Sequence, residues 1–361
     1  MTDALSAASL RDSRNLERTH PLTLFGLDAL VAGAARTRPT LRATQDHLDD
    51  RRESLAYADL DQAIGVFLAR LRDFGLSRGE RVLLIAGARS ETLIALTALI
   101  AAGLEPVLAP LRLDERRLAA AAHTTSAAAI FAPARIGDLS LEERLLSVAA
   151  QAPGVRLIGA LGGGAIDGAV DFSLEGLRQG SARRAPLDDG WTPGARTLIG
   201  ALDDDGRAHF LSQGALLGYS LDLVRKTRHG GPSPLIALSA PSNFAALVAG
   251  PLAALLSGAP LHFLSPFDSE RFIVALDSLG PARLIAPKAI LPDLARAGLL
   301  TSGAILSCVV LSGAQTEPVA FDPPPDCCPI LDIVAEGATL HMTPIDTRQS
   351  FPAQPVAQRV A

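Results

Sequence analysis

Side chains that could carry chemistry are few in this sequence, and most of them are scattered. The adjacent Cys327 and Cys328 and the single Cys308 fit neither a disulfide framework nor a spaced zinc site. The run Gly162–Gly164 lacks the spacing of a dinucleotide-binding loop, and the Gly-x-Ser-x-Gly motif of serine hydrolases does not occur. The seven histidines show no metal-ligand spacing: His20, His47, His123, His209, His229, His262 and His341. We therefore predict no metal site, and we interpret His262, inside an apolar run, as a hydrogen-bonded core residue.

The densest run of charge is at residues 203–207, where Asp203, Asp204 and Asp205 precede Gly206 and Arg207. Three carboxylates could bind a cation, but the side chains of consecutive residues point apart. Aspartate and glycine are typical of turns, because an aspartate carboxylate accepts hydrogen bonds from nearby backbone amides. The pattern predicts a solvated turn between two strands.

The segments around these residues predict alternating helices and strands. Apolar residues recur at spacings of three and four from 57 to 71, which predicts a helix capped by Ser54. Residues 82–85 form a short apolar run that is typical of a buried parallel strand. A helix is predicted from about residue 90 to 102, stopped by Gly103, with a strand at 106–108. Such repeated units imply right-handed crossovers in a mostly parallel sheet.

The second half of the sequence echoes the first. A helix end, a glycine, a proline and an apolar run occur around Gly103 and again around Gly258. We predict an α/β fold of two stacked, related subdomains, each with a mostly parallel sheet flanked by helices. The predicted divisions are a polar tail (1–20), a first subdomain (21–180), a linker (181–195), a second subdomain (196–345) and a C-terminal tail (346–361).

Composition excludes several classes of function. The chain has 361 residues, of which 48% are hydrophobic, so a large core can be buried. A net charge of -5 and 4% aromatic residues argue against nucleic-acid and anionic-membrane partners. Residues 244–264 are uncharged, but their glycines and prolines predict a buried helix and strand rather than a membrane span. The N-terminus lacks an apolar leader, and we expect a cytoplasmic protein.

Several segments together resemble the N-terminal large domain of the AMP-forming adenylating superfamily, which includes acyl-CoA synthetases, adenylation domains and luciferases. Residues 54–111 are similar to its opening subdomain, and residues 235–276 to its substrate-side helix and strand. Residues 283–287 and 306–314 fit two further strands, the second of which leads to a Gly-Ala turn at the adenine. The resemblance implies ATP with magnesium and CoA as cofactors and formation of an acyl-AMP as the activity.

The phosphate loop that the resemblance implies is altered here. In the family it reads approximately Thr-Ser-Gly-Thr-Thr-Gly-x-Pro-Lys-Gly, and its hydroxyls, amides and lysine hold the ATP phosphates. The corresponding residues 200–210 have neither those hydroxyls nor the lysine, and they carry Asp203, Asp204 and Asp205 instead. Carboxylates repel phosphate charge, so we expect binding of ATP and magnesium to be lost. Gly206 and Arg207 remain as candidates for cofactor contact.

The other candidate site residues also rest on the resemblance. Glu336 is the residue that survives from the family's Tyr-Gly-x-Thr-Glu loop, and it completes the cofactor-binding candidates. The substrate-binding candidates lie at the acyl pocket and the adenine turn: Asn243, Phe244, Ser312, Gly313 and Ala314. Any pocket should lie between these strand ends. We predict no catalytic residue, because we expect the family's mobile C-terminal domain, which carries the catalytic lysine, to be missing.

These departures predict an acyl-CoA synthetase-like domain that has lost ATP chemistry. Such a non-catalytic relative would bind a small acyl or aryl ligand, or a protein partner, in a biosynthetic pathway. One alternative is an active AMP-forming carboxylate ligase that takes its C-terminal domain from a second chain. Another is a purely structural or interaction module. Pyrophosphate exchange with a panel of carboxylic acids separates the active ligase from the other two.

Overall fold

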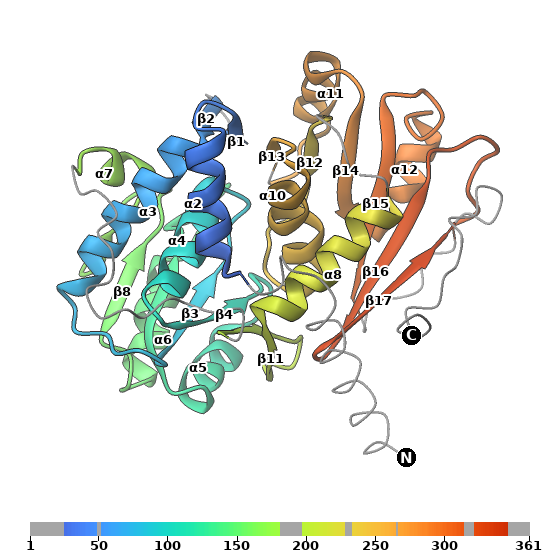
Figure 1. The fold of residues 1–361 in the computed structure, drawn as a ribbon. Coiled ribbons are helices and arrows are strands. Elements are labelled where there is room, and N and C mark those ends of the chain that lie inside the picture. Colours follow the sequence, from blue (N-terminus) through green and yellow to red (C-terminus); the bar gives the residue numbers. More distant parts are fainter. Residues whose placement is uncertain are drawn as a thin grey trace, which may run out of the picture.

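A computed structural model describes residues 25–48, 52–180, 197–227, 233–264, 266–313 and 321–345. The predicted linker 181–195 and the two predicted tails lie outside these residues. Two large sheets stand side by side, each flanked by helices (Figure 1). The predicted α/β class with mostly parallel sheets is confirmed. No helix in the described ranges is long and apolar enough to cross a membrane.

The first half of the chain contributes a helix, a hairpin and then alternating helices and strands. Its elements are α2 (Leu27–Thr37), β1 (Arg42–His47), β2 (Arg52–Ala56), α3 (Tyr57–Arg72), β3 (Arg81–Ile85), α4 (Ser90–Ala101), β4 (Glu105–Ala109), α5 (Glu115–Thr124), β5 (Ala127–Ala132), β6 (Arg135–Ile136), β7 (Leu139–Ser140), α6 (Glu142–Gln151), β8 (Leu157–Ala160), β9 (Val170–Asp171) and α7 (Leu174–Arg178).

The second half follows a similar succession and ends with β17, a strand that has no counterpart in the first large sheet. Its elements are β10 (Leu198–Leu202), β11 (Ala208–Ser212), α8 (Gln213–Lys226), β12 (Leu235–Ala237), α9 (Phe244–Leu247), the π-helix η2 (Val248–Leu252), α10 (Ala253–Ser257), β13 (Leu261–Phe263), α11 (Ser269–Leu279), β14 (Ala282–Pro287), the 3-10 helix η3 (Lys288–Ile290), α12 (Leu291–Arg296), β15 (Ile305–Gly313), β16 (Ile330–Glu336) and β17 (Thr339–Pro344).

One predicted helix start is wrong. Ser54 does not cap α3, because it lies in β2 and pairs with Gln45 of β1. The strand continues to Ala56, and the helix begins at Tyr57. The backbone amide of Ala56 donates instead to the Asp59 carboxylate at 3.0 Å, so an acidic residue inside the first turn satisfies the helix end.

The two sheets share one strand order. The first reads β11-β10-β4-β3-β5-β8-β9, and the second reads β2-β1-β13-β12-β14-β15-β16 with β17 at its far edge. Corresponding neighbours also have the same polarity, parallel throughout except at the β10–β11 and β1–β2 hairpins. Gly103 joins α4 to β4, Gly258 joins α10 to β13, and both glycines have positive φ. The predicted equivalence of these two joins is confirmed, because β4 and β13 hold the same place in the order.

Each sheet is completed by a hairpin from the other half of the chain. The β1–β2 hairpin lies within residues 21–180 but pairs with β13 in the second sheet. The β10–β11 hairpin lies within residues 196–345 but pairs with β4 in the first sheet. The predicted division at residues 181–195 therefore does not coincide with the division between the sheets.

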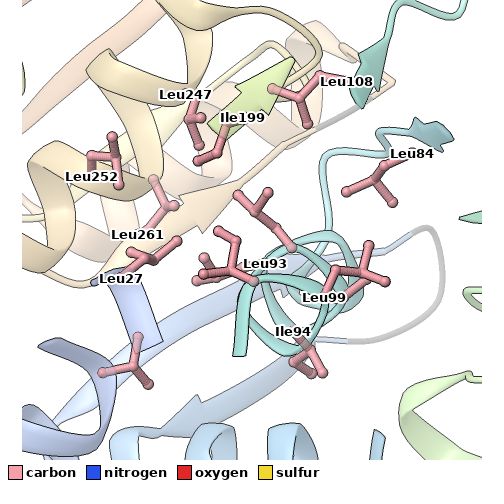
Figure 2. Packing of buried hydrophobic residues seen from close by; sticks show 14 of the residues in the cluster. Leu27, Leu84, Leu93, Ile94, Leu99, Leu108, Ile199, Leu247, Leu252 and Leu261 are labelled. Atoms are coloured by element: carbon pink, nitrogen blue, oxygen red, sulfur yellow. The ribbon is translucent and has the colours of Figure 1, made fainter. Parts of the chain in front are cut away.

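The main hydrophobic core lies between the sheets. Every residue of α4 is buried, and apolar side chains predominate on all sides of this helix, as expected of a helix enclosed by protein. Figure 2 shows Leu93, Ile94 and Leu99 of α4 in the same core cluster as Leu108 of β4 and Leu261 of β13. One core cluster thus joins residues of both sheets, which holds the loops at their strand ends in fixed positions relative to one another.

Candidate functional site

The position of the predicted phosphate loop is occupied by a closed hairpin turn, residues 203–207 between β10 and β11. One carboxylate oxygen of Asp203 accepts hydrogen bonds from the amides of Asp205 (3.0 Å) and Arg207 (2.9 Å). The amide of Asp203 donates to the Arg207 carbonyl, and the amide of Gly206 donates to the Asp203 carbonyl. Gly206 has φ +81°, which favours glycine. The predicted turn between two strands is confirmed.

Asp203 is further fixed by a histidine on the neighbouring strand. His209 Nε2 lies 2.9 Å from the second carboxylate oxygen of Asp203. Burial raises the pKa of Asp203, but the hydrogen bonds from His209, Arg207 and Asp205 outweigh burial and hold its pKa below the ordinary value. Asp203 is therefore an ionised, internally satisfied turn residue.

The other two aspartates of the turn have arginine partners. Arg112 forms an ion pair with the Asp204 carboxylate, and Arg117 of α5 donates to the Asp204 backbone carbonyl at 3.3 Å. The exposed Arg207 lies 3.6 Å from Asp205. The structure thus brings Arg112 and Arg117, from the first half of the chain, to the turn that contains Arg207. The turn is docked on α5 by these contacts.

The predicted cofactor residues converge on this turn from two hairpins. Glu336 is at the end of β16, and the β16–β17 connection passes through Gly337, which has φ +60°. A Cβ at Gly337 would lie 3.2 Å from Nδ1 of His209, so the two hairpins meet there. Glu336 itself is exposed and lies 3.8 Å from His341. Gly337, next to Glu336, thus lies beside His209 of the β10–β11 hairpin, and the cofactor-binding role of Glu336, Gly206 and Arg207 stays a prediction.

The predicted substrate residues lie at strand and helix ends of the second sheet. Asn243 caps α9 by accepting a hydrogen bond from the amide of Ala246 at 2.9 Å, and Phe244 is buried in the core. Gly313 pairs with Ala335 at the end of β15. Ala314 lies outside the described residues.

A small polar network that the sequence did not reveal adjoins Ser312. The Ser312 hydroxyl donates to one carboxylate oxygen of Asp332 at 2.7 Å, and Lys288 Nζ donates to the other at 2.7 Å. Asp332 is only 8% exposed, so its charge is compensated by these two partners. Lys288 follows β14 and Asp332 lies on β16, and only their pairing in the sheet brings them together. Because Asp332 already neutralises Lys288, this strand end does not offer a free cation.

Two hollows are open near strand and helix ends in the described structure. The larger, about 730 Å³, lies between α5 and the β10–β11 hairpin, and we call it the α5 groove. It is lined by Arg81, Asp114, Arg116, Arg117, Ala120, Ala121, Thr124, Thr125, Asp205, Gly206, Arg207, Ala208 and Phe210. The smaller, about 170 Å³, is lined by His47, Leu48, Arg89, Arg135, Gly137, Gly163, Pro266 and Arg271, and we call it the arginine pocket.

Neither hollow is lined by the predicted substrate residues, so the prediction that any pocket lies between those strand ends is wrong for both. Gly206 and Arg207 line the α5 groove, and Gly163 of the glycine run lines the arginine pocket. The substrate-binding role of Asn243, Phe244, Ser312 and Gly313 therefore stays a prediction. In the residue 203–207 turn, the backbone amides of Asp203, Asp205, Gly206 and Arg207 are bonded internally. Within the described ranges, no group of three or more His, Cys, Asp or Glu side chains is placed to hold a metal ion.

Comparison with known proteins agrees with the fold. Residues 31–174 match the family model of the AMP-binding enzymes. Acetoacetyl-CoA synthetase from Streptomyces lividans has a TM-score of 0.66 and 18% identity, over 85% of this chain and 51% of that one. The apo structure of MbtA from Mycobacterium smegmatis gives a TM-score of 0.68 and 19% identity, over 88% of this chain and 58% of that one. No curated protein sequence matches the chain.

The chain thus spans little more than half the length of these two solved structures. At such low identity the likeness concerns the fold, while the match over residues 31–174 concerns the family. Both agree with the α/β architecture of the chain. Residues 31–174 thus match the model of the AMP-binding enzymes, and the two-sheet fold of the chain is similar to that of the two solved structures.

Proposed function

We propose that this chain is a non-adenylating relative of the AMP-binding enzymes, which keeps their scaffold and does not bind ATP at the residue 203–207 turn. The observation that carries the proposal is the closed hairpin turn at the position of the phosphate loop. The proposal concerns the chemistry of this turn.

The backbone of the turn has few donors left for a phosphate. A phosphate-binding loop works because its N–H groups point at the anion and are otherwise unpaired. Here the amides of Asp203, Asp205, Gly206 and Arg207 all donate within the turn. Binding a phosphate would require breaking these hydrogen bonds, each of which contributes about 1 kcal/mol.

The charges of the turn oppose an anion as well. The cations nearest to the turn already face its carboxylates, Arg112 at Asp204 and Arg207 at Asp205. A phosphate would have to compete with these aspartates for the guanidinium groups. Repulsion between unit charges at 4 Å is about 1 kcal/mol in water and about 4 kcal/mol near a protein surface. Both terms act against the ATP triphosphate.

The scaffold can serve binding without adenylation. We propose a small carboxylic acyl or aryl ligand at the strand ends near Asn243 and Ser312, or a protein partner, as the retained binding function. We further propose a cytoplasmic location, because the three cysteines do not form the pattern of a disulfide framework. A ligand at this edge of the second sheet would lie beyond the carboxyl ends of parallel strands, where open α/β sheets commonly bind ligands.

Pyrophosphate exchange tests the proposal. The full chain is incubated with magnesium-ATP, labelled pyrophosphate and a panel of aliphatic and aromatic carboxylic acids. The expected result is no acid-dependent incorporation of label into ATP above a protein-free control. Acid-dependent exchange by the chain alone would overturn the proposal and favour the active ligase. Exchange that appears only when a second polypeptide is added would favour a ligase with a divided active site.

A further inference from the structure

The arginine pocket lies where strand ends of both sheets meet. Arg89 follows β3, Arg135 follows β5 and Gly163 follows β8, all at the carboxyl edge of the first sheet. His47 ends β1 and Pro266 follows β13, at the carboxyl edge of the second sheet. Crevices beyond the carboxyl ends of parallel strands are the usual ligand sites of α/β folds. This pocket therefore has the location of a binding site, although it shares no lining residue with the α5 groove.

The internal repeat relates this pocket to the region of the predicted nucleotide site. In the shared strand order β3 corresponds to β12, so Arg89 corresponds to the segment before Asn243 and the cap of α9. By the same order, Arg135 after β5 corresponds to Lys288 after β14. The glycine run after β8 corresponds to the end of β15 at Ser312 and Gly313. The arginine pocket is thus the counterpart, in the first sheet, of the crevice that the family resemblance assigned to the nucleotide.

One pair of corresponding arginines shows how the two crevices differ. Asp114 caps α5 by accepting from the Arg117 amide at 2.8 Å, and Asp268 caps α11 by accepting from the Arg271 amide at 2.8 Å. Arg117 and Arg271 are therefore equivalent. Arg117 lines the α5 groove and donates to the Asp204 carbonyl, whereas Arg271 lines the arginine pocket and lies 3.8 Å from the Asp268 carboxylate.

The described lining of the pocket is basic. It contains three arginines, Arg89, Arg135 and Arg271, and no acidic residue among the described ones, in a chain whose net charge is -5. Asp49 and Asp50 of the β1–β2 connection lie outside the described residues. Burial lowers the pKa of His47 to about 4, so His47 is a neutral hydrogen-bonding group at pH 7. Its Nε2 lies 3.1 Å from Nδ1 of His262, which fixes the ring.

The acidic residues behind the lining compensate Arg89 only in part. Asp46 accepts from the amide and hydroxyl of Ser90, and burial followed by the charge of Glu91 raises the pKa of Asp46 to about 7. Burial likewise raises the pKa of Glu91. Arg271 lies 3.8 Å from the Asp268 carboxylate, so the positive charge of the lining is partly compensated on both sides of the pocket.

The glycine run shapes the wall of the pocket. Gly163 has φ +78°, and a Cβ at this position would lie 2.8 Å from the carbonyl oxygen of Arg135. The backbone at Gly163 therefore lies so close to the β6 backbone that only a glycine fits there. This contact fixes the position of Arg135 at the rim of the pocket. The run that lacks dinucleotide-binding spacing thus has a structural role at this pocket.

We propose that the arginine pocket is a binding site for a phosphate group, either as the free ion or as the terminal phosphate of a larger ligand. Planar guanidinium groups bind oxyanions through paired N–H donors, and several of them favour a dianion over a monoanion. A volume of about 170 Å³ admits one phosphate with a few water molecules, since each water occupies about 30 Å³. The inference is independent of the proposal for the residue 203–207 turn.

Calorimetric titration of the full chain with inorganic phosphate at low salt tests the proposal, with Arg135→Gln as the variant. The Arg135 side chain makes no hydrogen bond or ion pair with another described residue, so R135Q is expected to fold as the wild type does. The expected result is one phosphate per chain and at least tenfold weaker binding by R135Q. R135K keeps the charge but not the paired donors, and it is expected to weaken binding severalfold.

Arg116→Gln is the matched control. Arg116 is an exposed arginine of the α5 groove that likewise has no described partner, so R116Q removes the same charge from a different hollow. It is expected to leave phosphate affinity within twofold. Equal weakening by R116Q and R135Q would overturn the proposal, because the effect would then be general charge attraction.

Two further ligands complete the test. Acetate at equal ionic strength is expected to bind at least tenfold more weakly than phosphate, and equal binding would overturn the assignment to phosphate. Glycerol phosphate distinguishes the two sources: tighter binding than inorganic phosphate identifies a larger phosphorylated ligand, and weaker binding identifies the free ion. Absence of measurable binding of both phosphate compounds would overturn the proposal.

Discussion

At the scale of single residues, Asp203 organises the residue 203–207 turn, which we propose replaces a phosphate loop. Its carboxylate accepts from two backbone amides and lies beside His209, so one side chain satisfies donors that an anion would otherwise bind. A serine or threonine in its place would leave some of these amides without a hydrogen-bond acceptor. The loss of a phosphate site and the stability of the turn thus depend on the same residue.

Replacing Asp203 by alanine should destabilise the protein by about 1–3 kcal/mol, because three hydrogen bonds to an ionised group are lost. Asp205→Ala is the control, since Asp205 has only a 3.6 Å contact with the exposed Arg207, and it should change stability by less than about 0.5 kcal/mol. Urea unfolding measures both. Equal effects would show that Asp203 does not organise the turn.

The contribution of Asp203 should depend on pH in a defined direction. Its pKa is lower in the folded state than the ordinary 3.8. The stabilisation is therefore fully present above pH 3.8 and lost as the pH falls through the folded-state value. The difference in unfolding free energy between wild type and Asp203→Ala should shrink below pH 4. A difference that grows toward acid pH would contradict the assignment.

The buried histidine pair provides a second pH-dependent term. Burial, followed by nearby positive charges, lowers the pKa of His47 to about 4 and that of His262 to about 3. The stabilisation from keeping them neutral is present above pH 6.5 and lost as the pH falls toward those values. Asp46, with a pKa raised to about 7, has the opposite sign: its contribution is present below 3.8 and lost as the pH rises through 7.

His262→Gln isolates the histidine term from that of Asp46. The variant removes one depressed pKa, so its stability relative to wild type should improve by at least about 1 kcal/mol between pH 7 and pH 5. Urea unfolding of both proteins at pH 7, 6 and 5 gives this difference. A relative stability that is constant over this range would show that His262 is not held neutral by burial.

At the scale of elements, the two glycine-ended helices define the repeat. Gly103 has φ +81° after α4, and Gly258 has φ +71° after α10. A Cβ at Gly258 would in addition lie 2.5 Å from Nη1 of Arg38. Both glycines turn the chain into the next strand through a conformation that other residues adopt at a cost.

Gly103→Ala should therefore destabilise the protein by about 1–2 kcal/mol. Gly33→Ala in α2 is the control, because Gly33 is inside a helix and a Cβ there would meet no atom within 4 Å. That control should stabilise the protein by about 0.5–1 kcal/mol. Thermal unfolding compares the two. Equal effects of the two substitutions would refute a conformational requirement at Gly103.

Local sequence patterns predicted several helices and strands and the 203–207 turn. Contacts between residues far apart in the sequence could not be predicted in this way. The 203–207 turn was predictable because aspartate and glycine determine turn geometry within a few residues. Its arginine partners were not, because Arg112 is far from Asp204 in the chain and meets it only through the β4–β10 pairing. The contact of His47 with His262 spans 215 positions for the same reason. The prediction that Ser54 caps α3 was wrong because the strand β2 continues past Ser54, although serine is a common helix-capping residue.

At the scale of the whole molecule, the exchange of hairpins makes the two sheets interdependent. Each sheet takes its edge hairpin from the other half of the chain, and one core cluster includes residues of both sheets. Neither sheet is complete without both halves. The described structure should therefore unfold as one cooperative unit, although the chain is long enough for two domains.

Two core substitutions test this cooperativity. Leu83→Ala in the first sheet and Ile236→Ala in the second both remove fully buried side chains, and each should cost about 2–5 kcal/mol. Each should lower the midpoint of one shared calorimetric transition. Leu139→Ala, at a half-exposed position, should leave that midpoint nearly unchanged. Two transitions, each moved by only one of the core variants, would contradict the interdependence of the sheets.

The central claim is that the residue 203–207 turn has replaced ATP binding, and calorimetric titration of the full chain with magnesium-ATP tests it most directly. The amides of Asp203, Asp205, Gly206 and Arg207 are bonded internally, and Arg112 and Arg207 already face carboxylates. We therefore predict no dissociation constant below about 100 µM, equivalent to about -5.5 kcal/mol. The same titration of R135Q separates binding at the turn from any phosphate contact in the arginine pocket. A dissociation constant below about 100 µM that R135Q leaves unchanged would contradict the account.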